Sequence, residues 1–333
     1  MVGKSYYGQL SDKKTNVLIF YWRKIMVILA GSGGIDQIAL TNFEKNFLTL
    51  AQQKQSKLEG SGVVKYLPSD GKYNTLPRSG KIELQSAEGR NPEKKYSDYS
   101  VDNRMLRKNR FTTTVLLDNL VDVNEVIADP TSYVMESLIA AKNRVTDRVI
   151  AASAIGNVLT GSANGPQTEV SAADDGVVTL DATSGFNYNT YTSIVEHYIN
   201  NDIPMDMIDR VKILATGAEN TDLMNEDKFI RNDYMAGNAV AKGLARPGLF
   251  DMILFAGSTT GGITVANPIL PEAETIRHCL ALAPESVALS MELGSLRIEQ
   301  SAKHVNSKEL TIDFWINGMR TEGARVIDIK TTI

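Results

Sequence analysis

The sequence predicts an α+β protein in which one long helix packs on an antiparallel sheet, next to a smaller α/β lobe. The first observation is a stretch from Asp129 to Gly156 whose apolar residues have helical spacing. The second is the alternation of apolar and polar residues over 287–293 and 310–316. The third is the succession of helical patterns and short apolar runs over 186–267. The helix and the sheet that would cover it are therefore far apart in the chain.

The long helix is expected from Pro130 to Ile155, about 40 Å at 1.5 Å per residue. Asp129 can cap its first turn, Pro130 suits the first helical position, and Gly156 can end it in a left-handed conformation. The apolar stripe consists of Val134, Leu138, Ala141, Val145, Val149 and Ala152. The residues predicted to face away from it are Glu136, Lys142, Asn143, Arg144, Asp147 and Arg148. Such a helix needs a flat partner.

The C-terminal part supplies a candidate for this partner. Its alternating apolar residues are Val287, Leu289, Met291 and Leu293, and then Leu310, Ile312, Phe314 and Ile316. Asn317-Gly318 is a typical hairpin turn, and Val326–Lys330 predicts a last strand. We expect these strands to form one antiparallel sheet with its apolar face on the helix.

The middle of the chain predicts the α/β lobe. Asn189–Asn200 and Ala218–Asn225 have helical patterns, whereas Val211–Ala215 and Phe250–Phe255 are short apolar runs typical of buried strands. Asp174-Asp175-Gly176, which precedes the lobe, predicts the turn of a hairpin.

The N-terminal part predicts an arm and not a core element. A helical pattern covers Ile38–Leu50, and the polar segment that follows it, 52–60, is compatible with a continued helix. Arg23 and Lys24 interrupt the apolar run before it could serve as a signal or a membrane anchor. With Met26 as a second candidate start, the first 25 residues are interpreted as an extension.

A charged stretch follows the arm. Between Arg78 and Arg110 nine basic residues stand against five acidic ones, so this stretch is +4 in a chain of −4 and the remainder is −8. With few apolar residues of its own, it predicts a long projecting hairpin, with Tyr96–Leu106 and Phe111–Leu117 as strands, whose partner surface is another molecule. A solvated loop that contacts nothing is the alternative. We expect removal of 81–107 to leave a soluble, folded chain that no longer assembles.

Composition and motifs predict that the protein is not an enzyme and needs no cofactor. The net charge of −4 argues against general nucleic-acid binding, and the single cysteine, Cys279, excludes an intrachain disulfide. The three histidines lack metal-ligand spacing. An acidic group could hold a divalent ion, although a solvated acidic face is the simpler interpretation: Asp202, Asp206, Asp209, Asp222, Glu226, Asp227 and Asp233.

The order of these elements resembles the major capsid proteins of tailed bacteriophages, the fold named after the Hong Kong ninety-seven phage. The similarity lies in QQKQSKL (52–58), DPTSYVMESLIAAKNRVTDRVI (129–150), EDKFIRNDY (226–234) and WINGMRTEGARVIDIKT (315–331). The resemblance implies an N-terminal arm over 1–61, an extended loop over 62–114 and an axial domain over 186–267. It also implies a peripheral domain made of 115–185 and 268–333, with 130–155 as its spine helix.

What the resemblance implies for function is a shell subunit that assembles into hexamers and pentamers of an icosahedral virion head around double-stranded DNA. The partners would be copies of itself, a separate scaffolding protein, a portal protein and, as a further candidate, a decoration protein, with assembly in the host bacterial cytoplasm and no membrane. Two alternatives stay open at this point. One is a cellular encapsulin-type shell protein, and the other is a two-lobed α/β metal-dependent hydrolase that uses the acidic group.

Two sets of residues are candidates for contacts between subunits. The first set, basic and in the extended loop, is Arg104, Arg107, Lys108 and Arg110. The second set, expected around the ring axis, is Glu226, Asp227, Arg231 and Asp233. Solvated side chains without a partner are the alternative for the first set.

Overall fold

A computed structural model of the chain describes residues 52–69, 73–91, 93–97, 100–118, 131–161, 165–226, 240–241, 244–245, 250–257, 269–273, 275–305 and 307–332. The chain divides into two compact units. The larger comprises Gln52–Thr113, Leu138–Ser295 and Ile312–Ile333, and the smaller draws on Thr114–Ser137 and Leu296–Thr311. The expected extension over 1–25 and the helix over 38–50 lie outside the described residues.

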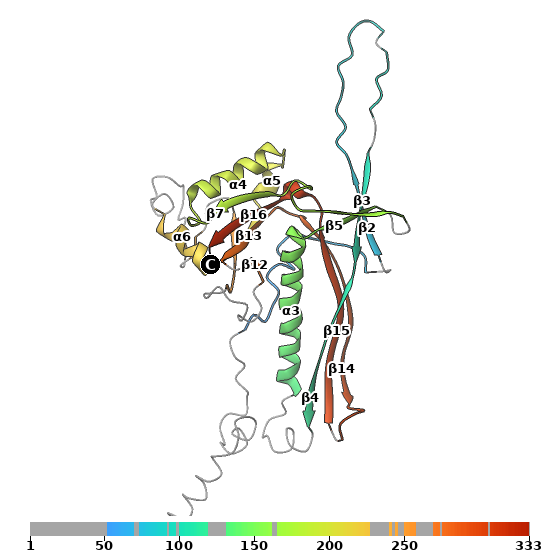
Figure 1. Cartoon of the computed structure of the whole chain (residues 1–333), viewed down its shortest axis with the longest axis vertical. Helices are drawn as coiled ribbons and strands as arrows, with labels where there is room; N and C mark the ends of the chain where they lie inside the picture. Colours follow the sequence, from blue (N-terminus) through green and yellow to red (C-terminus); the bar gives the residue numbers. More distant parts are fainter. Residues whose placement is uncertain are drawn as a thin grey trace, which may run out of the picture. The chain divides into compact units, whose positions relative to one another are not determined.

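Helix α3 (Thr131–Ile155) confirms the predicted long helix (Figure 1). The predicted apolar stripe is confirmed in part, since Leu138 is buried and Val145 and Val149 pack against the core. It is wrong at Ala152, which is exposed, and Asp147, expected to face away, is fully buried. The buried side chains of the helix are Leu138, Ala140, Thr146, Asp147, Ile150, Ala151 and Ala154. Gly156 follows the helix as predicted but does not adopt the left-handed conformation expected of it.

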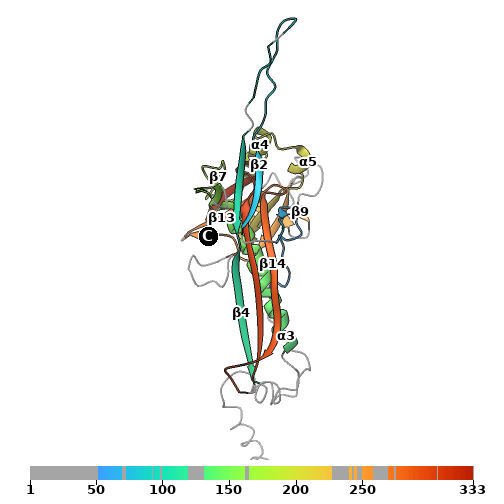
Figure 2. The same ribbon diagram turned by 90° about the vertical axis from the view of Figure 1, so that its right-hand side faces the viewer.

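The long sheet has the strand order β1-β14-β15-β4 (Figure 2). Its strands are β1 (Val64–Tyr66), β14 (Val287–Gln300), β15 (Ser307–Arg320) and β4 (Asn109–Asp118). The two alternating stretches of the sequence are therefore confirmed as neighbouring strands. The turn predicted at Asn317-Gly318 is wrong, since both residues lie within β15. A side-chain carbon on Gly318 would lie 2.6 Å from the hydroxyl of Ser153, so this glycine lets β15 pack closely on α3.

A second sheet has the order β11-β8-β13-β16-β7, with β12 paired to β13. Its strands are β7 (Val178–Ala182), β8 (Lys212–Thr216), β11 (Asp251–Phe255), β12 (Glu272–Ala273), β13 (Ile276–Leu282) and β16 (Val326–Thr332). The helices of this lobe are α4 (Tyr188–Asn200), α5 (Met205–Ile208) and α6 (Gly217–Asn225), and β9 (Val240–Ala241) pairs with β10 (Leu244–Ala245).

The assignment of the last strand to the long sheet was wrong, because β16 pairs with β13 and β7 in the second sheet. Four consecutive residues at the start of β16 are buried, so both faces of this strand are covered, as in an interior strand and not one with a single apolar face. The alternating helices and strands predicted between 189 and 255 are confirmed as α4, β8, α6 and β11.

The third sheet has the order β2-β3-β5-β6 and carries the extended loop. Its strands are β2 (Tyr73–Ser79), β3 (Val101–Arg107), β5 (Val158–Gly161) and β6 (Gln167–Val170). The hairpin is therefore built differently from the prediction, since its arms are β2 and β3 whereas 111–117 lies in β4 of the long sheet. The turn at Asp174–Gly176 is present, but its flanking strands β6 and β7 belong to different sheets and do not form a hairpin.

Candidate inter-subunit surface

The loop between β2 and β3, Gly80–Ser100, leaves its sheet as a long two-armed extension (Figure 1). Each residue of the loop whose side chain is described is exposed to solvent, including apolar ones. Leu84 is 101% exposed and Tyr96 is 87% exposed, values typical of side chains that contact almost nothing. A loop that exposes large apolar side chains in a single subunit is a candidate surface for a partner.

The charge of this loop differs from the prediction. Within Gly80–Ser100 four basic residues balance four acidic ones, so the extension itself is neutral. The +4 excess lies outside the loop, in β2, β3 and the start of β4 with the residue between them, where the acidic residue is Asp102 and the basic ones are Arg78, Arg104, Arg107, Lys108 and Arg110. The extension by itself therefore offers no net charge to an oppositely charged neighbour.

Arg104 is not at the surface, as the candidate contact was expected to be. Its side chain is 1% exposed and bonds entirely within the chain, pairing with the carboxylate of Asp175 and donating to the carbonyl oxygen of Arg320 at 2.7 Å. Its position in β3, directly opposite Leu76 of β2 and Thr160 of β5, makes it a residue of the sheet interior. No surface of Arg104 is left for a neighbour in this conformation.

Asp175 is the centre of a buried junction. Its other oxygen accepts from Nε of Arg320 at 2.7 Å, and a guanidinium nitrogen of Arg78 lies 3.5 Å away. Burial by itself would raise the pKa of Asp175, but the hydrogen bonds and charges of Arg104 and Arg320 outweigh it and hold the pKa below its usual value. The carboxylate is therefore charged at neutral pH and compensates the arginines around it.

Arg320 explains how helix α3 ends without a left-handed glycine. One of its terminal nitrogens donates to the carbonyl oxygens of Ala154 at 2.9 Å and Gly156 at 3.0 Å. These groups have no partner inside the helix, and a cation is favourable at a helix C-terminus. The junction therefore joins the end of α3, the end of β15, the turn before β7 and the sheet that carries the loop.

The other basic candidates lie at the far end of β3 and the start of β4. Nζ of Lys108 bonds to Glu292 at 2.5 Å, and Arg110 forms two bonds with the carboxylate of Asp313, at 2.9 and 2.6 Å. The side chain of Lys108 is 7% exposed, that of Arg110 is 56% exposed, and Arg107 is exposed. Arg107 and Arg110 therefore keep accessible surface, and a role in subunit contacts stays a prediction for them.

The acidic set expected around the ring axis is only partly described. Glu226 is half-buried and follows the last turn of α6, where its backbone N–H donates to Leu223 at 3.3 Å. Asp227, Arg231 and Asp233 lie outside the described residues.

The segment Gln52–Leu58 is fastened to α3 by a residue that the sequence analysis placed on the solvent side. The carboxylate of Asp147 accepts from the side chains of Gln53 and Ser56, the latter at 2.5 Å, and from the backbone N–H groups of Lys57 at 3.0 Å and Leu58 at 3.1 Å. We call this segment the strap. It is irregular rather than helical, and no local pattern around Asp147 could have revealed partners about ninety residues away.

Neighbouring groups hold the strap on both sides. Asn143 of α3 donates to the carbonyl oxygen of Lys54 at 2.8 Å. Nζ of Lys57 donates to the carbonyl oxygen of Leu254 at 2.6 Å and lies 5.1 Å from the ring centre of Phe255. The strap therefore links helix α3 to the end of β11.

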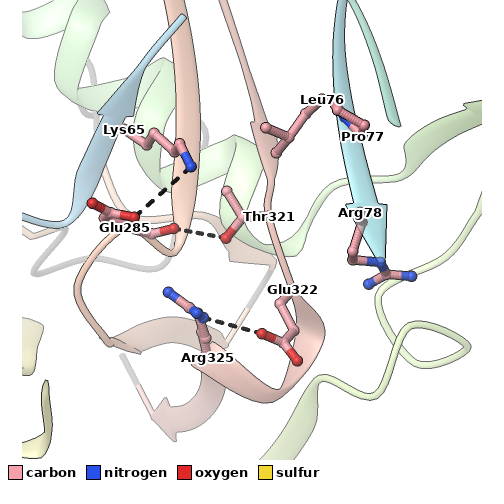
Figure 3. Close-up of a pocket in the computed structure, with 8 residues that line it drawn as sticks. All are labelled: Lys65, Leu76, Pro77, Arg78, Glu285, Thr321, Glu322 and Arg325. Atoms are coloured by element: carbon pink, nitrogen blue, oxygen red, sulfur yellow. Dashed lines mark hydrogen bonds and ion pairs between the residues drawn. The ribbon is translucent and has the colours of Figure 1, made fainter. Parts of the chain in front are cut away.

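A pocket of about 160 Å³ opens beside β2, as Figure 3 shows. Four of its charged groups form two pairs, Lys65 with Glu285 at 4.0 Å and Arg325 with Glu322 at 3.1 Å. The fifth, Arg78, pairs with carboxylates outside the lining. The full lining is Lys65, Leu76, Pro77, Arg78, Glu285, Thr321, Glu322 and Arg325. Because both cations and carboxylates line it, the pocket has no clear preference for a cationic or an anionic ligand.

Two histidines and the cysteine, side-chain types that often act in catalysis, are hydrogen-bonded within the chain or buried. His278 bonds to Asp328 at 2.9 Å, and burial lowers the pKa of His197, which bonds to the carbonyl oxygen of Ala324. Burial also raises the pKa of the Cys279 thiol. Among the described residues no three His, Cys, Asp or Glu side chains form a group that could hold a metal, and no helix is long and apolar enough to cross a membrane.

A family model described as phage capsid protein matches residues 35–333. The chain belongs to the phage capsid protein family. No curated protein matches its sequence. The resemblance stated from the sequence is confirmed, and this family is not a class of enzymes.

Solved phage capsids have the same fold as this capsid protein. The capsid of cyanophage P-SCSP1u is similar with a TM-score of 0.63 and 12% identity, covering 90% of this chain and 95% of that chain. The acidic stable capsid of Helicobacter pylori bacteriophage KHP30 gives 0.62 and 11%, covering 91% and 99%. Gordonia phage Cozz gives 0.59 and 16%, covering 91% and 96%. The α+β capsid fold predicted from the sequence is therefore confirmed.

Proposed function

We propose that this capsid protein is the major shell subunit of a tailed-phage head, where it forms hexamers and pentamers of an icosahedral capsid around double-stranded DNA. The observation that supports this most directly is the exposed Gly80–Ser100 loop, whose side chains have no cover on their own chain in the described residues. A contact of this kind, repeated from copy to copy by rotation, closes into rings.

The apolar side chains of the loop give the contact a driving force. Ile82 is 58% exposed, and Leu84 and Tyr96 are more exposed still. Burying one such side chain against a neighbour contributes about 1.5–3 kcal/mol. Because the extension is neutral, we expect these apolar groups to contribute more to association than its charges.

The remaining partners are proposed from the family resemblance. They are a separate scaffolding protein and a portal protein during assembly in the bacterial cytoplasm, a decoration protein as a further candidate, and packaged DNA held without sequence specificity. The net charge of −4 fits the last point, because a protein that binds DNA tightly usually carries a basic excess. A cellular shell that encloses protein is the second candidate, since the fold alone does not determine the cargo.

The decisive experiment removes only the extension. The deletion of 81–107 suggested by the sequence is unsuitable, because it would remove β3 and the buried Arg104. Replacing 82–98 by Asn-Gly instead leaves Gly80 opposite Ser100, whose backbones bond at 2.9 Å, and closes the arms with a favoured two-residue turn.

We expect this variant to fold, with a wild-type circular dichroism spectrum, and to form no closed shells in electron micrographs of cells that coexpress the neighbouring genes. A control that fills 82–98 with glycine and serine keeps the length of the loop but not its side chains. We expect it to fail as well. Normal shells from both variants would refute the proposed role of the loop, and nuclease-resistant DNA or protein in wild-type shells would distinguish the two cargoes.

A further inference from the structure

The direction of the extended loop depends on how its base is attached. The loop enters β3 at Val101, and Arg104 is the first residue of β3 whose side chain is fully buried. Arg104 follows Val101 by three positions in the strand, about 10 Å at 3.3 Å per residue. Arg104 is therefore the buried contact of β3 nearest to the loop.

The group that Arg104 contacts is itself fixed. Asp175 is held by Arg320, which also bonds to the end of α3, and the Asp175 backbone packs directly on Gly323. A side-chain carbon on Gly323 would lie 2.0 Å from the carbonyl oxygen of Asp175. Arg104 thus connects the sheet that carries the loop to the point where the end of α3, the end of β15 and the turn before β7 are in direct contact.

The other attachments of this sheet are distant from the loop or more exposed. Arg78 of β2 also lies 3.5 Å from Asp175, but its side chain is 38% exposed whereas that of Arg104 is 1% exposed. Asn74, near the far end of β2, donates to the hydroxyl of Ser290 at 2.6 Å. The apolar contact is a small cluster of Leu106, Val158, Ala288 and Met319, with Leu67 and Leu76 partly buried against it.

Near the loop, the sheet borders an open pocket and not packed side chains. A pocket of about 300 Å³ lies at the loop base, lined by Arg78, Ser79, Gly80, Lys81, Ser100, Asp102 and Glu322. The pocket of Figure 3 shares two of these lining residues, Arg78 and Glu322. Lys81 reaches Asp202 across 3.8 Å, but both side chains are at least 80% exposed, and such pairs contribute little.

We propose that Arg104 is a positioning residue that fixes the direction in which the extended loop leaves the subunit, by tying β3 to the buried junction at Asp175. A loop that bends must then do so beyond the Arg78–Asp102 pair, at Gly80 and Ser100. The role is intramolecular, in place of the contact with a neighbour that the sequence suggested for this arginine.

The test measures the attachment in unassembled subunits, so that its outcome does not depend on the proposed shell function. Spin labels are placed on two exposed positions, by V101C at the loop base and T192C on α4, while native Cys279 is buried. Double electron–electron resonance then gives the distribution of distances between the labels. R104M keeps the length of the side chain but removes its hydrogen bonds, and R104K keeps its charge. The control is R210M, which makes the same change at an arginine after α5 whose side chain is 63% exposed.

We expect one narrow distribution for wild type and R210M, a distribution at least twice as broad for R104M, and an intermediate width for R104K. A folded R104M with the wild-type distribution would overturn the proposal. If R104M does not fold, R104K decides, because a width equal to that of wild type contradicts the role and a larger width supports it. Shells that fail in R104M although the loop is intact would link this positioning to assembly.

Discussion

Replacing Asp147 by alanine should release the strap from helix α3. The carboxylate accepts four hydrogen bonds, two of them from the backbone N–H groups of Lys57 and Leu58. Leu58 is fully buried, so its N–H would be left without a partner in a site that water does not reach. Hydrogen bonds to charged groups contribute about 1.5–3 kcal/mol each, and an unsatisfied buried donor costs about 1–3 kcal/mol.

The expected loss is smaller than the sum of these values, because the strap can detach without unfolding the remainder. We expect D147A to lower the free energy of unfolding by about 3 kcal/mol, and the strap to open about a hundredfold more often. Urea denaturation measures the first quantity. Amide hydrogen exchange at Lys57 and Leu58 measures the second.

A matched control is D206A on α5, which changes the same residue type at a side chain that is 73% exposed and, among the residues the structure describes, pairs with Arg210 alone. It should leave both measurements close to those of wild type. If D147A were as stable as D206A, with unchanged exchange at Leu58, Asp147 would not be the group that holds the strap.

Three further predictions concern buried charges and a close backbone contact. Burial raises the pKa of Asp175, but its arginines lower it by more, so the pKa in the folded protein lies below its usual value. The carboxylate therefore stabilises the fold fully above about pH 4, and this stabilisation is lost as the pH falls through the lowered pKa. The unfolding midpoints of wild type and R104M should converge in acid for this reason. R277M should leave the buried carboxylate of Glu219 without its cation, because Arg277 contacts this carboxylate at 3.1 Å. We expect the free energy of unfolding, measured in urea, to fall by about 3–5 kcal/mol. G323A should lower the thermal midpoint, at a cost of about 1–3 kcal/mol, because its new side chain meets backbone atoms.

Each of these predictions has a control. An alanine at Gly217, where an added side-chain carbon meets nothing within 4 Å, should not destabilise the protein, so equal losses in G217A and G323A would contradict the steric argument. Adding E219Q to R277M should recover part of the loss, because the stranded charge is removed. A constant difference between wild type and R104M from pH 7 to pH 2 would show that Asp175 is not the titrating partner.

The sequence was sufficient for the elements whose signals are local. The helix predicted over 130–155 is confirmed over 131–155, and the strands around Leu289 and Ile312 and the α/β alternation over 189–255 are confirmed as well. Their signal is the spacing of apolar residues, which is a local property of the sequence. Gly318 shows where local signals mislead. Asn-Gly is a strong turn signal, yet here the glycine makes room for α3, and that requirement depends on Ser153.

The buried charged residues could not have been located from the sequence. Asp147 and Arg104 were both assigned to the surface on residue type, since charged groups are seldom buried unless they are paired. Their partners, the strap and Asp175, are about seventy to ninety residues away, and no spacing reports a pairing of that separation. The sequence predicted that a hairpin projects from the subunit. How the base of this loop is attached to the rest of the subunit depends on a distant pair, Arg104 with Asp175.

The most direct test of the central claim is electron microscopy of particles from the wild-type protein and from the variant in which 82–98 is replaced by Asn-Gly, both expressed with their neighbouring genes. Closed shells from the wild type and only folded, unassembled subunits from the variant are the predicted result. Closed shells of normal size from the variant would contradict the claim that the loop joins one subunit to the next.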